Sequence, residues 1–291
     1  MASNMIELIK VLRERTGAGN LDCKKALEAN DMDVDKAVDY LREKGVAKVA
    51  KKASRIAAEG LCDIKVCEKC GRAAIVEVNC ETDFVARGDI FHKLVADSVA
   101  QVLHEGYESL DEAKKGLEKM YLEAGMKLGE KLDFRRFQIV EKKPGQMFGT
   151  YIHNGSQIGV IVVIDKEDEE LATGLAMHIA ANNPSYICEH CIPQEVIEKE
   201  KHIAIEAAKE DPKLANKPDA VVQHIIEGKV NKLLKETTLL EQPYLLDGEQ
   251  TVGAVLKQKG INVVDFVRFA VGEGIEKRHE DFAEEVAKQI Q

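Results

Sequence analysis

The spacing of apolar residues in the first 44 positions predicts three short helices. Two sets have the spacing of a helix face: Met5, Ile9, Leu12, and Val34, Ala37, Val38, Leu41. The glycines of "TGAGN" (16–20) separate the first helix from a second that begins near Asn20 or Asp22, and Gly45 is expected to end the third. A bundle of this size is marginal as an enzyme and typical of a docking module.

From Gly60 onward the pattern changes to the alternation of strands. "LCDIKV" and "AAIVEV" flank the turn "CEKCGR" and predict a hairpin, which helical spacing follows from Phe91 to Val102. Residues 146–181 repeat this order of hairpin and helix, and "LDFRRFQIV" (132–140) predicts a strand between the two halves. We therefore expect an α+β fold whose core has two similar subdomains with antiparallel sheets.

Two charged helices are predicted at 193–210 and 219–236. Val196 and Ile203 on the first, and Val222, Ile226 and Leu233 on the second, form narrow apolar seams, which favours an antiparallel coiled-coil hairpin standing away from the body. A strand is predicted in 263–274. A last helix follows, whose apolar face packs on the body or on a partner; that face consists of Phe282, Val286 and Ile290.

Composition excludes several classes of function. The formal net charge of −10 makes the surface a poor partner for nucleic acid, and the absence of tryptophan disfavours a base-stacking platform. The longest apolar runs, such as "IGVIVVI" (158–164), are far too short to span a bilayer, and the N-terminal residues lack the apolar core of a signal peptide. We expect a cytoplasmic protein with no direct nucleic-acid or membrane partner.

Seven cysteines, an odd number, favour reduced thiols in a chain large enough not to need disulfides. Two pairs have the spacing of metal ligands, Cys67 with Cys70 and Cys188 with Cys191. Four thiolates would bind zinc tetrahedrally, but the pairs lie more than a hundred residues apart. The alternatives of a shared zinc site and of ordinary thiols in two turns stay open, and the prediction is that no metal is bound.

Catalytic motifs are absent from the sequence. There is no G-x-x-x-x-G-K-[ST], no G-x-G-x-x-G after a strand and no G-x-S-x-G. His178 lies in an apolar helix and is predicted to be a packed core residue, His202 and His224 to be solvated, and His153, in a hairpin turn, to be exposed. We expect no enzymatic activity and no cofactor.

The segment "NCETDFVARG" (79–88) places a large ring, Phe84, in a polar turn after a buried strand. The ring could belong to the core, or the protein could present it to another molecule. From composition and pattern alone, the core is the favoured alternative.

Five long segments resemble the bacterial elongation factor Ts family along the whole chain. They are "LRERTGAGNLDCKKAL" (12–27), "EVNCETDFVA" (77–86), "GTYIHNGSQIGVIVV" (149–163), "AMHIAA" (176–181) and "RFAVGEGIEK" (268–277). The resemblance implies a guanine-nucleotide exchange factor that binds elongation factor Tu in its GDP-bound and nucleotide-free states. A homodimer or a 2:2 complex with that partner is left open.

The resemblance also implies a division of the chain into modules. These are a UBA-like three-helix module (1–45), a linker (46–59), a core N-subdomain (60–145), a core C-subdomain (146–192 and 237–275), a coiled-coil hairpin insertion (193–236) and a C-terminal helical module (276–291).

Site residues carry over by position. In the family, the segment that here reads Thr82, Asp83, Phe84 and Val85 enters the nucleotide-binding domain of the partner and dislocates Mg²⁺. The positions that correspond to partner contacts are Lys10, Arg13, Asn20, Leu21, Leu128, Gly129 and His153. Asn20 and Leu21 stand where members often carry two methionines, so one flexible apolar side chain is missing from that contact.

Two alternatives from other classes remain at this point. One is an adaptor that binds ubiquitin-like partners through residues 1–45, and the other is a zinc or thiol protein that uses the cysteine pairs.

Overall fold

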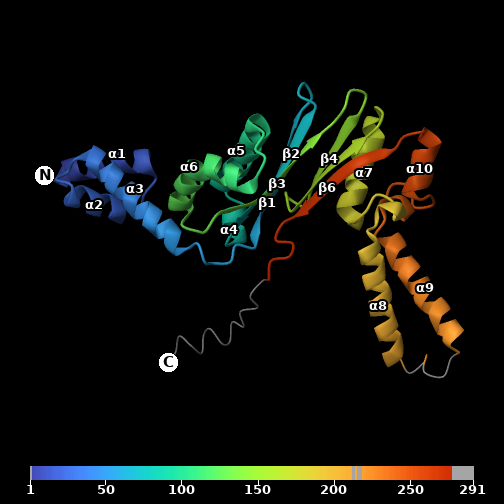
Figure 1. Cartoon of the computed structure of the whole chain (residues 1–291). Coiled ribbons are helices and arrows are strands. Elements are labelled where there is room, and N and C mark those ends of the chain that lie inside the picture. The colour runs from blue at the N-terminus through green and yellow to red at the C-terminus, as the bar shows by residue number, and fades with distance from the viewer. Residues whose placement is uncertain (1, 212–213, 215–217, 277–291) are drawn as a thin grey trace.

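The computed structural model describes residues 2–211, 214 and 218–276. The described residues form a helical bundle at the N-terminus, a central body of two sheets covered by helices, and a pair of long helices that projects from the body (Figure 1). The α+β class predicted from the sequence is confirmed, with two small antiparallel sheets.

The N-terminal bundle consists of α1 (Ala2–Thr16), α2 (Asn20–Ala29) and α3 (Val34–Lys51). Its core is a cluster around Leu12 and Leu27, both fully buried. The prediction that Gly45 ends the third helix is wrong, because α3 continues to Lys51. Gly45 is instead the place where α6 approaches: a Cβ there would lie 1.9 Å from the Met126 sulfur. Part of the predicted linker is therefore helical.

The first sheet has the order β1-β2-β3 and is antiparallel throughout. Its strands are β1 (Glu59–Cys67), β2 (Arg72–Cys80) and β3 (Asp133–Glu141), so the predicted hairpin and the predicted connecting strand both form. Two helices, α5 (Asp89–Glu105) and α6 (Leu110–Leu128), contribute apolar side chains to the cluster on its outer face, which includes Phe91 and Leu117.

The second sheet has the order β4-β5-β6 and repeats this arrangement. It contains β4 (Met147–His153), β5 (Ile158–Ile164) and β6 (Val263–Ala270). Its outer cluster is completed by α7 (Glu169–Asn182), by α10 (Val252–Lys259) and by a short 3-10 turn, η2 (Leu239–Glu241). The similarity of the two halves predicted from the sequence is thus present.

The inner faces of the two sheets pack against each other through one shared apolar cluster, which includes Ile75, Ile161 and Phe269. Alternate residues of β2 and β5 therefore point to a helix-covered face and to the opposite sheet, so both strands are almost entirely buried. This accounts for the continuous apolar runs in the sequence of these strands.

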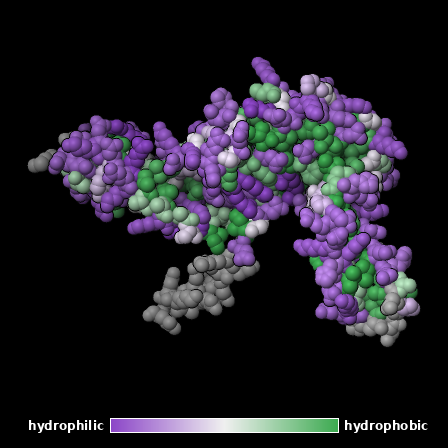
Figure 2. All heavy atoms as spheres, viewed as in Figure 1, coloured by the Kyte–Doolittle hydropathy of each residue, from purple (hydrophilic) through white to green (hydrophobic). Residues whose placement is uncertain are grey.

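The projecting helices are α8 (Gln194–Glu210) and α9 (Asp219–Glu236), which lie side by side away from the sheets (Figure 1). The predicted seam is wrong at two positions, because Ile203 is 50% exposed and Leu233 is 39% exposed. The predicted Val222 and Ile226 of α9 do lie in the contact, and on α8 the contact uses Ala204 and Ala208. Apolar atoms are visible along this pair in Figure 2. Small alanines let the two helices approach closely, which apolar spacing alone did not indicate.

Two helices were missed by the pattern analysis, α6 and α10. Each begins after a side-chain N-cap, Ser109 for α6 and Thr251 for α10. The four-residue α4 (Asp83–Ala86) lies where a turn was expected. The predicted C-terminal helix falls in 277–291, outside the described residues. None of the described helices combines the length and the apolar character needed to cross a bilayer.

Candidate functional site

Phe84 lies on α4, at the point where β2 has ended and the chain turns toward α5. The side chain of Thr82 caps this helix by accepting a hydrogen bond from the Val85 amide at 3.3 Å. Val85 and the buried Ala86 pack on the apolar cluster at the outer face of the first sheet, so the side chain of Phe84 points outward. The Phe84 residue is 82% exposed, the largest exposed fraction of any large apolar residue in the described chain.

Glu130 holds the start of α4 in place. One carboxylate oxygen accepts hydrogen bonds from the amides of Glu81 and Thr82, each at 3.0 Å, and the other accepts from the Thr82 hydroxyl at 2.6 Å. Bonds to an ionised acceptor are roughly twice as strong as those between neutral groups. The loop that carries Phe84 is therefore fixed to the segment that follows α6. Sequence reasoning missed Glu130.

Glu81 adds a second connection at the same place. Its carboxylate accepts from the Lys131 amide at 2.6 Å and forms an ion pair with Arg55 at 3.1 Å, while the Lys131 ammonium donates to the Arg55 carbonyl at 2.8 Å. The side chain of Lys52 donates to the Gly129 carbonyl. The chain after α3, the end of β2 and the end of α6 thus meet beside Phe84.

Asp83 is half-exposed and forms an ion pair with Arg87 one turn along, at 3.0 Å. Both side chains face solvent, 48% and 81% exposed, and exposed pairs of this kind contribute about 0–1 kcal/mol. Little free energy therefore opposes the release of the Asp83 carboxylate to another charged group.

Leu128 and Gly129 lie next to this loop, because Glu130 bonds to it directly. Leu128 is half-buried and packs on the first outer cluster, and Gly129 ends α6 in the left-handed conformation with φ 73°. The exposed surface at this position is therefore mainly backbone. A glycine adopts this conformation without the penalty that a Cβ would bring.

His153 is exposed at the end of β4, as predicted, and its Nδ1 lies 3.2 Å from the Tyr151 hydroxyl oxygen. The turn after it is bonded to the start of β1: the Ser156 carbonyl accepts from the Cys62 amide at 2.7 Å. Because β1 starts where antiparallel β2 ends, this turn and α4 lie at the same end of the two sheets.

Lys10, Arg13, Asn20 and Leu21 are exposed on the N-terminal bundle. Leu21 is 74% exposed, while Asn20 is the first residue of α2 and provides no side-chain cap, because the capping position is Gly19. These residues lie on a different part of the chain from α4. The bundle is attached to the body through the contact between α3 and α6.

The family comparison covers the part of the chain that contains α4. The sequence model of the family described as "Elongation factor TS" matches residues 81–273, which is more than half of the 291 residues. The chain belongs to the elongation factor Ts family. As a member of that family it is a translation elongation factor, and the family's general role is nucleotide exchange on elongation factor Tu rather than enzymatic catalysis.

The matched range of this elongation factor Ts chain includes α4, the segment after α6 and the β4–β5 turn, but not the N-terminal bundle. Lys10, Arg13, Asn20 and Leu21 thus lie outside the match. Their assignment depends on the motifs in the sequence alone.

The sequence predicts reduced thiols in this elongation factor Ts chain, but both cysteine pairs form disulfides. Cys67 forms a disulfide with Cys70, and Cys188 forms one with Cys191. A shared zinc site is also not formed, since no group of three or more His, Cys, Asp or Glu side chains among the described residues is placed to hold a metal ion. The spacing within each pair fits a disulfide as well as a metal, so sequence could not separate the two.

His178 is a packed core residue, as predicted. It is fully buried, its Nε2 lies 2.9 Å from the Gln242 side-chain oxygen, and its Nδ1 accepts from the Leu245 amide at 3.1 Å. Burial lowers the pKa of the imidazole. His178 therefore connects α7 to the segment after α9 and takes no part in the site around Phe84.

Proposed function

We propose that this chain is a cytoplasmic guanine-nucleotide exchange factor that binds elongation factor Tu carrying GDP, dislocates its Mg²⁺ and releases the nucleotide so that GTP can bind. Family membership supports the general role. The observation that carries the specific mechanism is an aromatic ring that is 82% exposed on a short helix clamped by Glu130 and Glu81.

The way in which a GTP-binding protein holds its nucleotide explains how an exposed ring can promote GDP release. In a GTP-binding protein, backbone N–H groups cradle the phosphates and Mg²⁺ bridges phosphate to protein. Moving the ion removes much of the local positive charge, so the affinity for phosphate falls. In this proposal Phe84 wedges between side chains of the partner near the ion, Asp83 competes for the groups that hold it, and Thr82 and Val85 fix the loop.

Linkage sets the size of the effect. A factor that binds the nucleotide-free partner more tightly than the loaded one must weaken nucleotide binding by the same ratio. A coupling free energy of about 4 kcal/mol would loosen GDP roughly a thousandfold. No covalent step is required, which is consistent with the lack of catalytic motifs in the sequence.

We further propose that the remaining family positions dock the two proteins. Gly129 and His153, with the half-buried Leu128, would contact the partner beside α4, and Lys10, Arg13, Asn20 and Leu21 would contact it through the bundle. The proposed modules keep the boundaries stated above, with the helical linker up to Lys51 joining bundle and core.

The test is the release of a fluorescent GDP from purified elongation factor Tu, followed with and without a substoichiometric amount of this protein. We expect many partner molecules to lose nucleotide per molecule of factor, and excess Mg²⁺ to slow the release. Unchanged release would contradict the proposal, and stimulation insensitive to Mg²⁺ would contradict the mechanism.

A further inference from the structure

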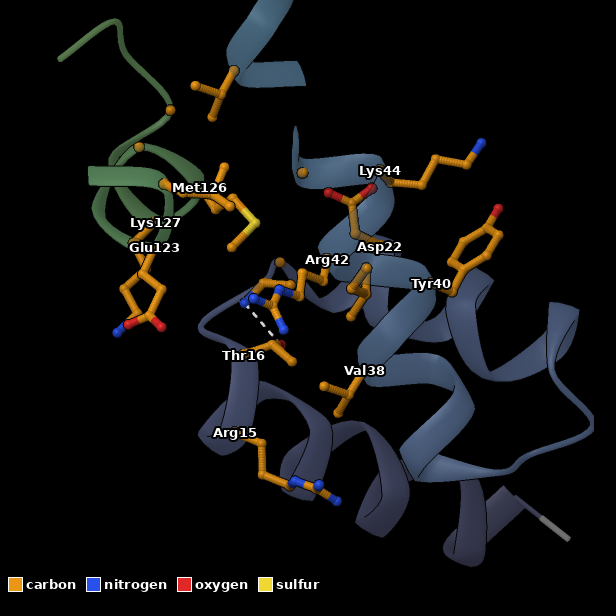
Figure 3. Close-up of a pocket in the computed structure, with 18 of the residues that line it drawn as sticks. Arg15, Thr16, Asp22, Val38, Tyr40, Arg42, Lys44, Glu123, Met126 and Lys127 are labelled. Carbon is orange, nitrogen blue, oxygen red and sulfur yellow. Dashed lines mark hydrogen bonds between the residues drawn. The ribbon is translucent and has the colours of Figure 1, made fainter. Parts of the chain in front are cut away.

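A cleft of about 750 Å³ lies between the N-terminal bundle and α6 (Figure 3). Its apolar lining comes from Val38, Leu41 and Val49 of α3 and from Leu122 and Met126 of α6. Apolar atoms are visible at this junction in Figure 2. The cleft exists because Met126 packs directly on Gly45, which brings the two helices together below it.

The cleft is strongly positive. Among the described residues, seven Lys and Arg side chains line it against two carboxylates. Arg15 is paired with Asp35, but Lys25, Arg42, Lys119 and Lys127 form no ion pair with another described residue. Within the described part of the chain, cations without an ion pair are therefore concentrated here, in a protein whose net charge is −10. A mixed apolar and cationic lining fits an amphipathic, acidic segment better than a small anion.

One segment of this chain has that chemistry, residues 279–291, which lies outside the described residues. It has apolar residues four positions apart, at Phe282, Val286 and Ile290. It also carries four carboxylates and one lysine, of which Glu284 and Glu285 are adjacent. As a helix it would present an apolar face with acidic flanks.

The segment can reach the cleft. Gly272 lies against Ala58, since a Cβ on the glycine would be 2.5 Å from the Ala58 carbonyl oxygen. Six residues separate Ala58 from Lys52 of the cleft, at most about 20 Å of chain, whereas the ten residues from Gly272 to Phe282 span up to about 33 Å.

We propose that, in the free protein, residues 279–291 dock in the cleft between α3 and α6 of the same chain. The apolar residues cover the contact between α3 and α6, and the carboxylates neutralise the unpaired cations. The tail thus fastens the N-terminal bundle to the body in a salt-dependent way. This inference concerns the free chain and does not depend on the exchange function.

The test is hydrogen–deuterium exchange on the full chain and on a chain that ends at Glu276. For a docked segment with a dissociation constant near 0.1 mM and an effective concentration near 1 mM, we expect exchange of peptides from α3 and α6 to be about tenfold slower in the full chain. Peptides from α7, far from the cleft, should exchange equally in both. The difference should shrink at 1 M salt, where the screening length is about 3 Å.

Charge reversal tests the recognition itself. Lys119→Glu with Lys127→Glu should remove most of the protection, and adding Glu284→Lys with Glu285→Lys to that variant should restore it. The matched control, Lys199→Glu with Lys201→Glu on exposed positions of α8, should leave it unchanged.

Three outcomes would overturn the proposal. Equal exchange of α3 and α6 in the full and shortened chains would mean that the cleft is empty or holds another ligand. Protection that disappears on hundredfold dilution would mean that the tail of a second copy fills it. Failure of a peptide of residues 277–291 to bind the shortened chain, while the full chain is protected, would mean that the tail acts elsewhere.

Discussion

Replacing Phe84 with alanine should slow nucleotide exchange while the protein stays folded. Less than a fifth of the residue is covered in the free protein. A fully buried Phe→Ala change costs about 3–5 kcal/mol, so the free energy of unfolding should fall here by about 1 kcal/mol or less. The Glu130 clamp uses the backbone and Thr82, so it should survive the substitution.

The loss in exchange follows from the surface that the ring offers. A phenylalanine presents about 200 Å², of which roughly four fifths is free here, and burying it at about 25 cal/mol per Å² gives an upper value of about 4 kcal/mol. Alanine would keep part of that surface. We therefore expect a loss of about 2–3 kcal/mol, or a 30- to 150-fold fall in kcat/KM for stimulated GDP release.

The assay is fluorescent GDP release from elongation factor Tu at several concentrations of the variant, together with its urea unfolding midpoint. The matched control is Leu246→Ala, which removes another large exposed side chain, 59% exposed, beside α7. That variant should exchange normally. A Phe84→Ala protein that keeps its midpoint and releases GDP within threefold of the unaltered protein would refute the reasoning.

Three further outcomes follow from the structure. Glu130→Ala should slow GDP release although Phe84 is intact, because three hydrogen bonds that position the loop are lost, and Glu130→Gln should recover part of the rate; equal rates in all three proteins would contradict the role of the clamp. The free energy of unfolding should fall as the pH drops below about 6.5, because burial lowers the pKa of His178 and the unfolded chain then binds a proton that the folded chain resists. In the His178→Gln variant, the urea midpoint should lack this pH dependence between pH 6.5 and 5. An identical pH dependence in the variant would assign the effect to other groups. Iodoacetamide should label no cysteine of the native protein before mild reduction and four afterwards, counted by mass, because burial protects the remaining three thiols and raises the pKa of two of them to about 12; early labelling would contradict either the disulfides or the burial. The protected thiols are Cys23, Cys62 and Cys80.

Local pattern was sufficient for most elements of the fold. The two projecting helices follow from the period of their apolar residues, and the hairpins and α7 follow from their short apolar runs and the turns between them. The prediction failed where one residue type can serve two structural roles. Gly45 was interpreted as a helix end, whereas it lies inside α3 because α6 needs close approach at that point.

The candidate site was likewise predicted from the sequence only in part. The motif around Phe84 identified the family and the loop, but sequence alone favoured a buried ring. Only the tertiary structure decided that the ring is exposed, since α4 orients its apolar residues by helical period: Val85 and Ala86 fill the inner face and leave the ring outside.

The sequence by itself determined the class of fold and the family, and it indicated the segment that carries the candidate site. The tertiary structure alone decided how that segment is held. Glu130 is about fifty residues from Thr82 along the chain, and Lys52 is farther still from Gly129, so no local pattern connects them. Contacts of this kind form because packing of the sheets and helices brings distant backbone groups together, and the partly buried amides of Glu81 and Thr82 then find an acceptor in Glu130.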